Sequence, residues 1–222
     1  DEYMKFINDP KHITKPGEEM RMFVWDLLEF FSRTPWYHIG LFWTPVVLYK
    51  LWQGYYEMAM LEMVFILILG ILHWTFLEYT LHRFIFHMEM YMPDSRYLRA
   101  FHYVIHGVHH AFPMDAGRLV FPIILAIPLY FVIWNILSLM YPAYIINSLT
   151  AGMIGSYMCY DMGHYYLHHS QPMQFVEYRK KYHMYHHYKD PDNGYGITTS
   201  IWDKVFGTEL DMSKNQINRA SL

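Results

Sequence analysis

Four apolar stretches dominate this chain and restrict the folds open to it. They lie at about 36–51, about 58–81, 119–140 and about 143–162. About 20 apolar helical residues are needed to cross the hydrocarbon core of a bilayer. The links at 52–57 and 141–142 are so short that consecutive stretches must run in opposite directions. The sequence therefore predicts an all-α integral membrane protein with four transmembrane helices.

The basic residues indicate how these helices are oriented. The long polar segments 1–35, 82–118 and 163–222 hold five, four and seven Lys or Arg residues, that is, 16 of the 17. Only Lys50 lies near the opposite face. By the positive-inside rule these segments, and both termini, form a helical cap in the cytosol. The alternative is a soluble protein with buried helices, but soluble cores do not sort charge in this way.

Composition excludes two further classes of protein. The formal net charge of −3 argues against a nucleic-acid-binding protein. The single cysteine, Cys159, excludes a disulfide scaffold. Histidine is the unusual residue, because the chain has 15 of them against 17 Lys and Arg.

Ten histidines gather where the apolar stretches end and in the adjoining polar segments. They lie in the motifs HRFIFH, HGVHH, HYYLHH and HMYHH, and the candidate metal ligands are His82, His87, His106, His109, His110, His164, His168, His183, His186 and His187.

Spacing determines which of these side chains can converge. The two HxxHH triads place their members at i, i+3 and i+4, which is one face of a helix. His164 and His168 are four residues apart and share a face. His82 and His87 are five apart, about 140° on an ideal helix, so they require a distorted turn or a metal between their two directions.

The number and type of these side chains predict a two-metal centre. Neutral imidazole is a good ligand for zinc, iron, copper and nickel. Ten imidazoles are too many for one ion and suit two ions with about five each. We expect no catalytic side chains beyond these ligands.

Bound imidazoles need hydrogen-bond partners that orient them. Glu78 lies one turn before His82, and Asp161 lies three residues before His164. Carboxylates so near a membrane segment are costly unless paired, although both could instead reach the interface. The candidates for orienting the ligands are therefore Glu78, Asp161, His102 and His169.

The chemistry of such a centre points away from hydrolysis. A zinc hydrolase keeps three protein ligands and a water, and the chain contains no HExxH motif. A fully histidine-ligated pair of metals at a membrane face is typical of oxygenases that attack unactivated C–H bonds. That reaction needs a redox-active metal, two external electrons and a dry channel for an alkyl chain.

The four histidine motifs resemble those of the fatty acid hydroxylase superfamily. Within it, FHYVIHGVHHAFPMDAGRLVFP (101–122) and GYGITTSIWDKVFGT (194–208) closely resemble the fatty acid 2-hydroxylases, or sphingolipid alpha-hydroxylases, and in particular the fungal ceramide very long chain fatty acid hydroxylases. The resemblance implies the same ten histidines as ligands of two metal ions.

The resemblance also implies a reaction and a location. These are O2-dependent hydroxylation of carbon 2 of a very long fatty acyl chain, within ceramide, in the endoplasmic reticulum membrane. Electrons come from cytochrome b5 or its reductase. Iron is expected for activity, whereas a purified sample could hold zinc.

Many members of this superfamily carry an N-terminal cytochrome b5 domain, and none is visible here. We expect residues 1–222 to form a single membrane-embedded hydroxylase domain. Three alternatives stay open: a desaturase or sterol oxidase with the same metal core, a non-catalytic scaffold held by zinc, and a metal transporter. A transporter would place its ligands near the bilayer midplane, where only His73 lies.

Overall fold

The computed structural model describes residues 2–11, 20–171 and 173–212, and within these ranges it contains helices and no strands. The all-α prediction is confirmed. The α-helices are α1 (Glu2–Ile7), α2 (Asp26–Phe31), α3 (Trp36–Glu57), α4 (Met60–Leu81), α5 (Arg96–His102), α6 (Val108–Ala111), α7 (Ile123–Met140), α8 (Ala143–His169), α9 (Gln174–Tyr188) and α10 (Ile201–Phe206).

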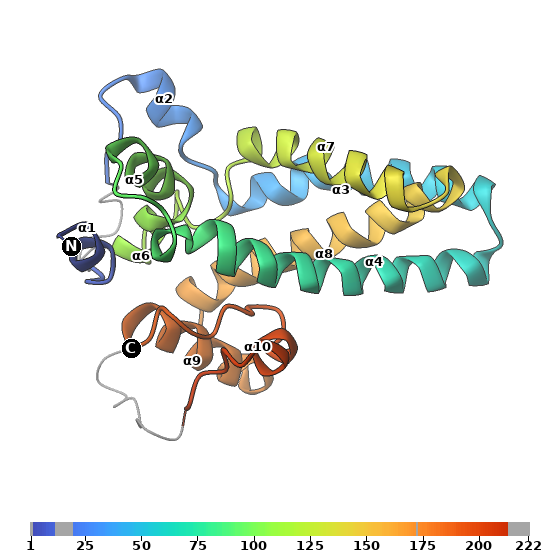
Figure 1. Cartoon of the computed structure of the whole chain (residues 1–222). Coiled ribbons are helices and arrows are strands. Elements are labelled where there is room, and N and C mark those ends of the chain that lie inside the picture. Colours follow the sequence, from blue (N-terminus) through green and yellow to red (C-terminus); the bar gives the residue numbers. More distant parts are fainter. Residues whose placement is uncertain (1, 12–19, 172, 213–222) are drawn as a thin grey trace.

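Four long helices, α3, α4, α7 and α8, run side by side along one axis (Figure 1). They correspond to the four apolar stretches of the sequence. Helix α8 packs closely against both α3 and α4 and forms the centre of the bundle. The short helices α1, α2, α5, α6, α9 and α10 gather around one end of the bundle, with α10 against the side of α4, and form the cap (Figure 1).

Helices α4 and α8 approach each other through glycines. A Cβ atom on Gly152 would lie 2.4 Å from the carbonyl oxygen of Leu67, and one on Gly70 would lie 2.3 Å from that of Leu149. Neither position has room for a side chain, because the obstructing atoms are backbone. Small residues that let two backbones touch are typical of helix pairs in membranes.

This contact gives a prediction about stability. Replacing Gly152 by Ala should lower the free energy of unfolding by about 1–3 kcal/mol, the usual cost of overpacking. Thermal unfolding in detergent, followed by circular dichroism, measures the change. Gly155→Ala is the matched control on the same helix, because a Cβ there meets nothing within 4 Å. Equal melting temperatures for the two variants would contradict this account of the contact.

Within the residues that the structure describes, two helices meet the length and apolarity needed to cross a membrane: Met60–Phe86 and Ile123–Met140. The prediction of a membrane protein is thus supported, but these helices account for two of the four predicted spans. Helix α3 carries Lys50 and Glu57 near its far end. Helix α8 is buried among its neighbours over much of its length. Its sequence therefore reflects packing between helices.

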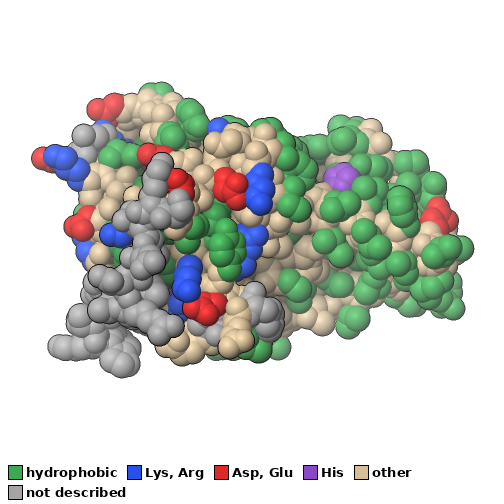
Figure 2. Space-filling view, turned by 90° about the horizontal axis from the view of Figure 1, so that it is seen from below, with side chains coloured by type: hydrophobic (Ala, Val, Ile, Leu, Met, Phe, Trp, Pro, Cys, Tyr) green, Lys and Arg blue, Asp and Glu red, His purple; other side chains and the backbone are tan. Residues whose placement is uncertain are grey.

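Apolar and charged side chains occupy different parts of the surface, as the helix bundle and the cap occupy different parts of the fold. Figure 2 shows hydrophobic side chains covering the part of this face that the long helices form, whereas Lys, Arg, Asp and Glu gather over the cap. Exposed apolar side chains on α4 and α7 include Leu61, Phe65, Phe131 and Leu139. Such a continuous apolar surface is expected where lipid replaces water.

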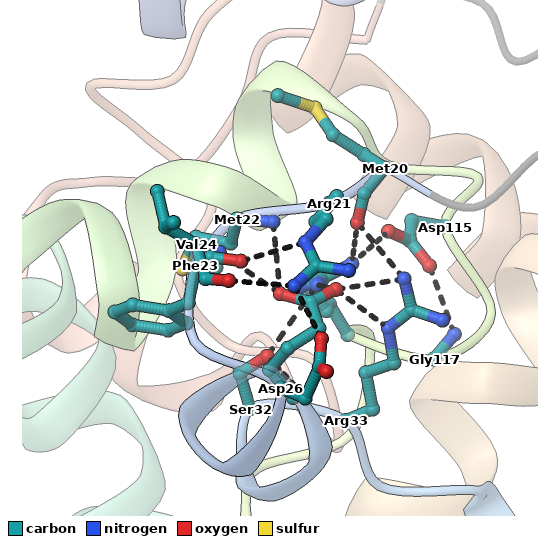
Figure 3. Close-up of polar contacts among 12 residues, drawn as sticks. Met20, Arg21, Met22, Phe23, Val24, Asp26, Ser32, Arg33, Asp115 and Gly117 are labelled. Carbon is teal, nitrogen blue, oxygen red and sulfur yellow. Dashed lines mark hydrogen bonds and ion pairs between the residues drawn. The ribbon is translucent and has the colours of Figure 1, made fainter.

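A buried cluster of ion pairs lies where the polypeptide passes from the cap into the helix bundle (Figure 3). Arg118 pairs with Glu29 at 2.5 Å and with Asp115 at 2.8 Å, and Arg33 pairs with Glu29 at 2.7 Å. Arg118 also donates to the carbonyl oxygen of Met20. The cluster ties the segment around α2 to the loop that leads from α6 to α7.

Candidate metal centre

The structure brings all ten candidate histidines together in the cap, next to the end of the helix bundle. They form two groups, and within each group the nearest ring nitrogens all lie within 4.8 Å of one another. The first group contains His82, His87, His106, His110 and His186, and the second contains His109, His164, His168, His183 and His187. All ten side chains are buried.

Two π-helical turns bring the first group together. One covers His82–Phe86, directly after α4, and the His87 N–H donates to the His82 carbonyl at 3.0 Å. A π turn closes over five residues, so it brings positions i and i+5 to one side. The distorted turn expected for this pair is therefore present. A second π turn, Tyr103–Gly107, lies just before α6 and contains His106.

Each HxxHH triad supplies both groups. His106 and His110 join the first group, whereas His109 between them joins the second. In α9 the division is reversed, because His183 and His187 join the second group and His186 joins the first. The groups are adjacent as a result: the rings of His110 and His187 lie 4.4 Å apart.

Distances within the second group test whether it fits a metal ion. The Nε2 atom of His183 lies 2.7 Å, 2.9 Å and 3.0 Å from the Nε2 atoms of His164, His168 and His187. A ring nitrogen carries either one hydrogen or one lone pair, so hydrogen bonds cannot satisfy all three contacts. Two ligands about 2.0–2.1 Å from one ion, at a right angle, would be about 2.9 Å apart.

Ring nitrogens also converge in the first group. The Nε2 atoms of His82 and His106 are 3.2 Å apart, and those of His87 and His186 are 3.1 Å apart. Burial lowers the pKa of His106 well below its usual range, and the neighbouring imidazoles lower it further. The pKa values of His109 and His183 are lowered for the same reasons. Neutral rings with converging lone pairs are what a divalent cation requires.

Backbone carbonyls of the loop after α9 orient two imidazoles of the first group. His82 Nδ1 lies 2.5 Å from the carbonyl oxygen of Tyr195, and His186 Nδ1 lies 2.7 Å from that of Asn193. Asp203 holds this loop by accepting from the N–H groups of Tyr195 and Gly196, both at 2.9 Å. The 194–208 stretch is therefore part of the support of the centre.

The two carboxylates expected to orient imidazoles bond to backbone instead. Glu78 accepts from the N–H groups of Ile197 and Thr198, both at 2.8 Å, and so fastens α4 to the loop after α9. Asp161 is buried and accepts from the Phe121 N–H at 3.2 Å. Sequence spacing does not reveal these amide donors, and the second oxygen of Glu78 is buried without a hydrogen-bond partner.

The other two candidates behave differently from each other. His102 is buried, and its Nε2 atom lies 2.7 Å from the carboxylate of Glu89. That same carboxylate lies 2.9 Å from Nδ1 of His87. His169 is half-buried, and its ring lies against that of Tyr165, outside both groups. No pattern in the sequence indicates Glu89, which resembles any charged residue of a cap loop.

An apolar cavity, partly open at its surface, lies beside the centre, among α3, α4, α7 and α8. Along α8 its lining extends from Thr150 to Tyr160, about 15 Å of helix. Phe86, Phe121 and Tyr160 line both this cavity and a smaller one that reaches His106, His109 and His164. These three aromatic residues thus form a neck between the apolar cavity and the histidines.

Each group of histidines is packed against one aromatic residue of this neck. The ring of Phe86 is stacked on His106 with centroids 5.2 Å apart, and that of Tyr160 on His164 at 6.0 Å. The inner end of the apolar cavity therefore faces both groups of histidines.

Comparison with known proteins agrees with this architecture. The sequence model of the family described as fatty acid hydroxylase matches residues 67–208. The chain is 41% identical to the dihydroceramide fatty acyl 2-hydroxylase FAH2 of Arabidopsis thaliana, over 94% of this chain and 86% of that protein.

Two further relatives are longer than this chain. The ceramide very long chain fatty acid hydroxylase SCS7 of Saccharomyces cerevisiae is 39% identical over 95% of this chain and 54% of that protein. The fatty acid 2-hydroxylase of Mus musculus is 37% identical over 94% of this chain and 60% of that protein. The chain thus spans between half and two thirds of these two relatives.

A solved structure described as full-length scs7p, with only the hydroxylase domain visible, has the same fold. Its TM-score to this chain is 0.88 at 37% sequence identity, covering 94% of this chain and 78% of that one. The sequence match, the shared fold and the paired histidine groups lead to one conclusion: the chain belongs to the fatty acid hydroxylase family.

Proposed function

We propose that this protein is an O2-dependent membrane hydroxylase that acts on carbon 2 of the very long fatty acyl chain of ceramide. The observation that carries the proposal is the apolar cavity leading to two buried groups of five histidines. The names of the relatives from plants, yeast and mouse support carbon 2 and the ceramide class of substrate.

In this proposal the ten histidines are the ligands of two metal ions. Two observations support the assignment: the Nε2 atoms converge, and the pKa of His183 in the cap is lowered. When bound, a redox-active pair of ions supplies the activation of O2, and we propose iron for that reason. Zinc fits the same imidazoles but has no redox chemistry.

The protein's own contribution is to place the substrate and keep water out. The acyl tail lies in the cavity between the long helices, and carbon 2 reaches the neck formed by Phe86, Phe121 and Tyr160. One oxygen atom enters the C–H bond at carbon 2. The other leaves as water, with two protons and two electrons from an external donor.

We further propose cytochrome b5 as that donor and the endoplasmic reticulum membrane as the location. All four long helices cross the bilayer, and the metal centre and both termini lie on the cytosolic side. The charge distribution supports this orientation, because 16 of the 17 Lys and Arg residues fall in the predicted cytosolic segments. Residues 1–222 form one hydroxylase domain in this proposal.

A product analysis tests the reaction. Iron-loaded protein is given ceramide deuterated at carbon 2, ¹⁸O2 and a chemical or cytochrome b5 electron source, and the lipid is examined by mass spectrometry. We expect one deuterium to be lost and one ¹⁸O gained. A product that loses two hydrogens and gains no oxygen would identify a desaturase and overturn the proposal.

The cavity gives a separate prediction about substrate binding. Ala126, on α7, is buried and lines the cavity. Ala126→Phe should fill part of it and lower kcat/KM for very long chain ceramide by about tenfold or more, with the metal content unchanged. The control is Leu139→Phe on the same helix, where the side chain is 90% exposed. Equal kinetics for the two variants would show that the cavity does not hold the acyl chain.

A further inference from the structure

One buried carboxylate contacts the first histidine group from outside it. Glu89 lies in the short helical turn Met88–Met90 that follows His87, and its side chain is only 3% exposed. Its Oε1 atom lies 2.9 Å from His87 Nδ1, and its Oε2 atom lies 2.7 Å from His102 Nε2. Oε1 accepts from His87, whereas the hydrogen bond of His102 Nε2 goes to the Phe86 carbonyl at 2.8 Å.

The contacts continue to the first helix of the protein. The hydroxyl of Tyr3, on α1, lies 2.5 Å from His102 Nδ1. Gly107 makes this approach possible, because a Cβ there would lie 2.9 Å from the Tyr3 hydroxyl and 3.1 Å from His102 Nδ1. The segment after α1 is itself bound to α6, since the Lys11 N–H donates to the Ala111 carbonyl at 2.8 Å.

The chemistry of these groups gives each atom one role. The Tyr3 hydroxyl donates to His102 Nδ1, and the Nε2–H of His102 donates to the Phe86 carbonyl at 2.8 Å while lying 2.7 Å from Glu89 Oε2. The other carboxylate oxygen accepts from the Nδ1–H of His87. His87 then has its hydrogen on Nδ1, and its Nε2 lone pair faces His186 Nε2, 3.1 Å away in the first group.

We propose that Glu89 is a positioning residue that fixes the tautomer and ring orientation of His87 towards the ion of the first group. His102, which is hydrogen-bonded to Tyr3 and to the Phe86 carbonyl, lies against the other oxygen of this carboxylate. The inference rests on the two-ion centre proposed above, but it does not depend on the reaction or the substrate. Glu89 contacts only one of the two groups, so it should affect only one of the two ions.

The experiment uses the full chain loaded with zinc, so that no turnover is needed. Zinc release to a coloured chelator is followed in wild type, Glu89→Ala, Glu89→Gln and Glu89→Asp, with helical circular dichroism as a check of folding. Asp94→Asn is the matched control in the same loop, where the carboxylate is 83% exposed and pairs with Arg99.

We expect two zinc ions per wild-type chain. In Glu89→Ala one ion should leave about 10–100-fold faster and the other at the wild-type rate. Glu89→Gln keeps the shape but turns an N–H group towards one imidazole, so it should accelerate the same ion. Glu89→Asp, which keeps a carboxylate, should restore part of the difference, and Asp94→Asn should match wild type.

Two results would overturn the role of Glu89. Equal acceleration of both ions in folded Glu89→Gln would show a general effect on structure, and unchanged release of both would show no effect at all. The wild-type zinc count tests the two-ion centre separately. Fewer than two ions in wild type would refute that centre and the inference together, whereas two ions with an unaltered variant would refute the inference alone.

Discussion

Replacing His183 by alanine should abolish hydroxylation and remove one of the two metal ions. The Nε2 atom of this residue lies within 3.0 Å of three other Nε2 atoms of the second group. Its loss opens one side of the site around which they converge. We expect a loss of activity greater than the roughly 10–100-fold that accompanies removal of a partner of a metal ligand. Product formation from ceramide and metal content per chain measure the two effects.

His169→Ala is the matched control for this prediction. His169 lies at the end of α8, next to His168, but it is half-buried and belongs to neither group. The control should keep both metal ions and nearly full activity. If His183→Ala kept two ions and full turnover, the assignment of the second group as a metal site would be wrong. His183→Ala could also fail to fold, and His164→Asn and His168→Asn then test the same site. If both of these variants folded and were fully active, the assignment would be contradicted equally.

The second large effect concerns the identity of the metal. Protein reloaded with iron should hydroxylate ceramide, whereas the same protein loaded only with zinc should form no product above background. Zinc is redox-inactive and cannot take part in the transfer of two electrons to O2. The measurement compares product formed per chain by the two preparations, with metal content determined for each.

Thermal stability distinguishes a zinc-loaded protein that is folded but inactive from one that has lost its fold. Both metals bind imidazole well, so zinc-loaded and iron-loaded protein should have similar melting temperatures, each above that of the metal-free protein. Full turnover by zinc-loaded protein free of iron would refute the proposed oxygenase chemistry. It would leave the geometry of the centre intact and would require a different reaction.

The sequence predicts the long helices well because lipid and packing both favour apolar side chains along their length. The stretch expected at 58–81 corresponds to α4, Met60–Leu81, and the stretch at 143–162 to the first part of α8. Helix α8 continues to His169 because the helix leaves the bundle and enters the cap. Apolarity alone could not locate that end, since the added turns carry the imidazoles.

The candidate site was predictable only where local geometry decides it. Helical spacing selects His106, His109 and His110, and the five-residue spacing of His82 and His87 requires the π turn that the structure has. Spacing could not show that each triad divides between two groups, because that depends on how α6 and α9 face each other.

The supports of the site were the least predictable part. The carbonyl groups of Asn193 and Tyr195 accept from two imidazoles, and a carbonyl is present in every residue. Glu78 and Asp161 were expected to contact imidazoles, but they accept hydrogen bonds from amide N–H groups of distant loops. Such contacts are set by tertiary packing, for which a single sequence has no pattern.

Diffraction at the absorption edge of the bound metal tests the central claim most directly. In crystals of the metal-loaded protein, we predict two anomalous peaks per chain. One should be surrounded by the first histidine group and the other by the second, both beside the neck of the apolar cavity. A single peak shared by all ten imidazoles, or peaks outside both groups, would contradict the account.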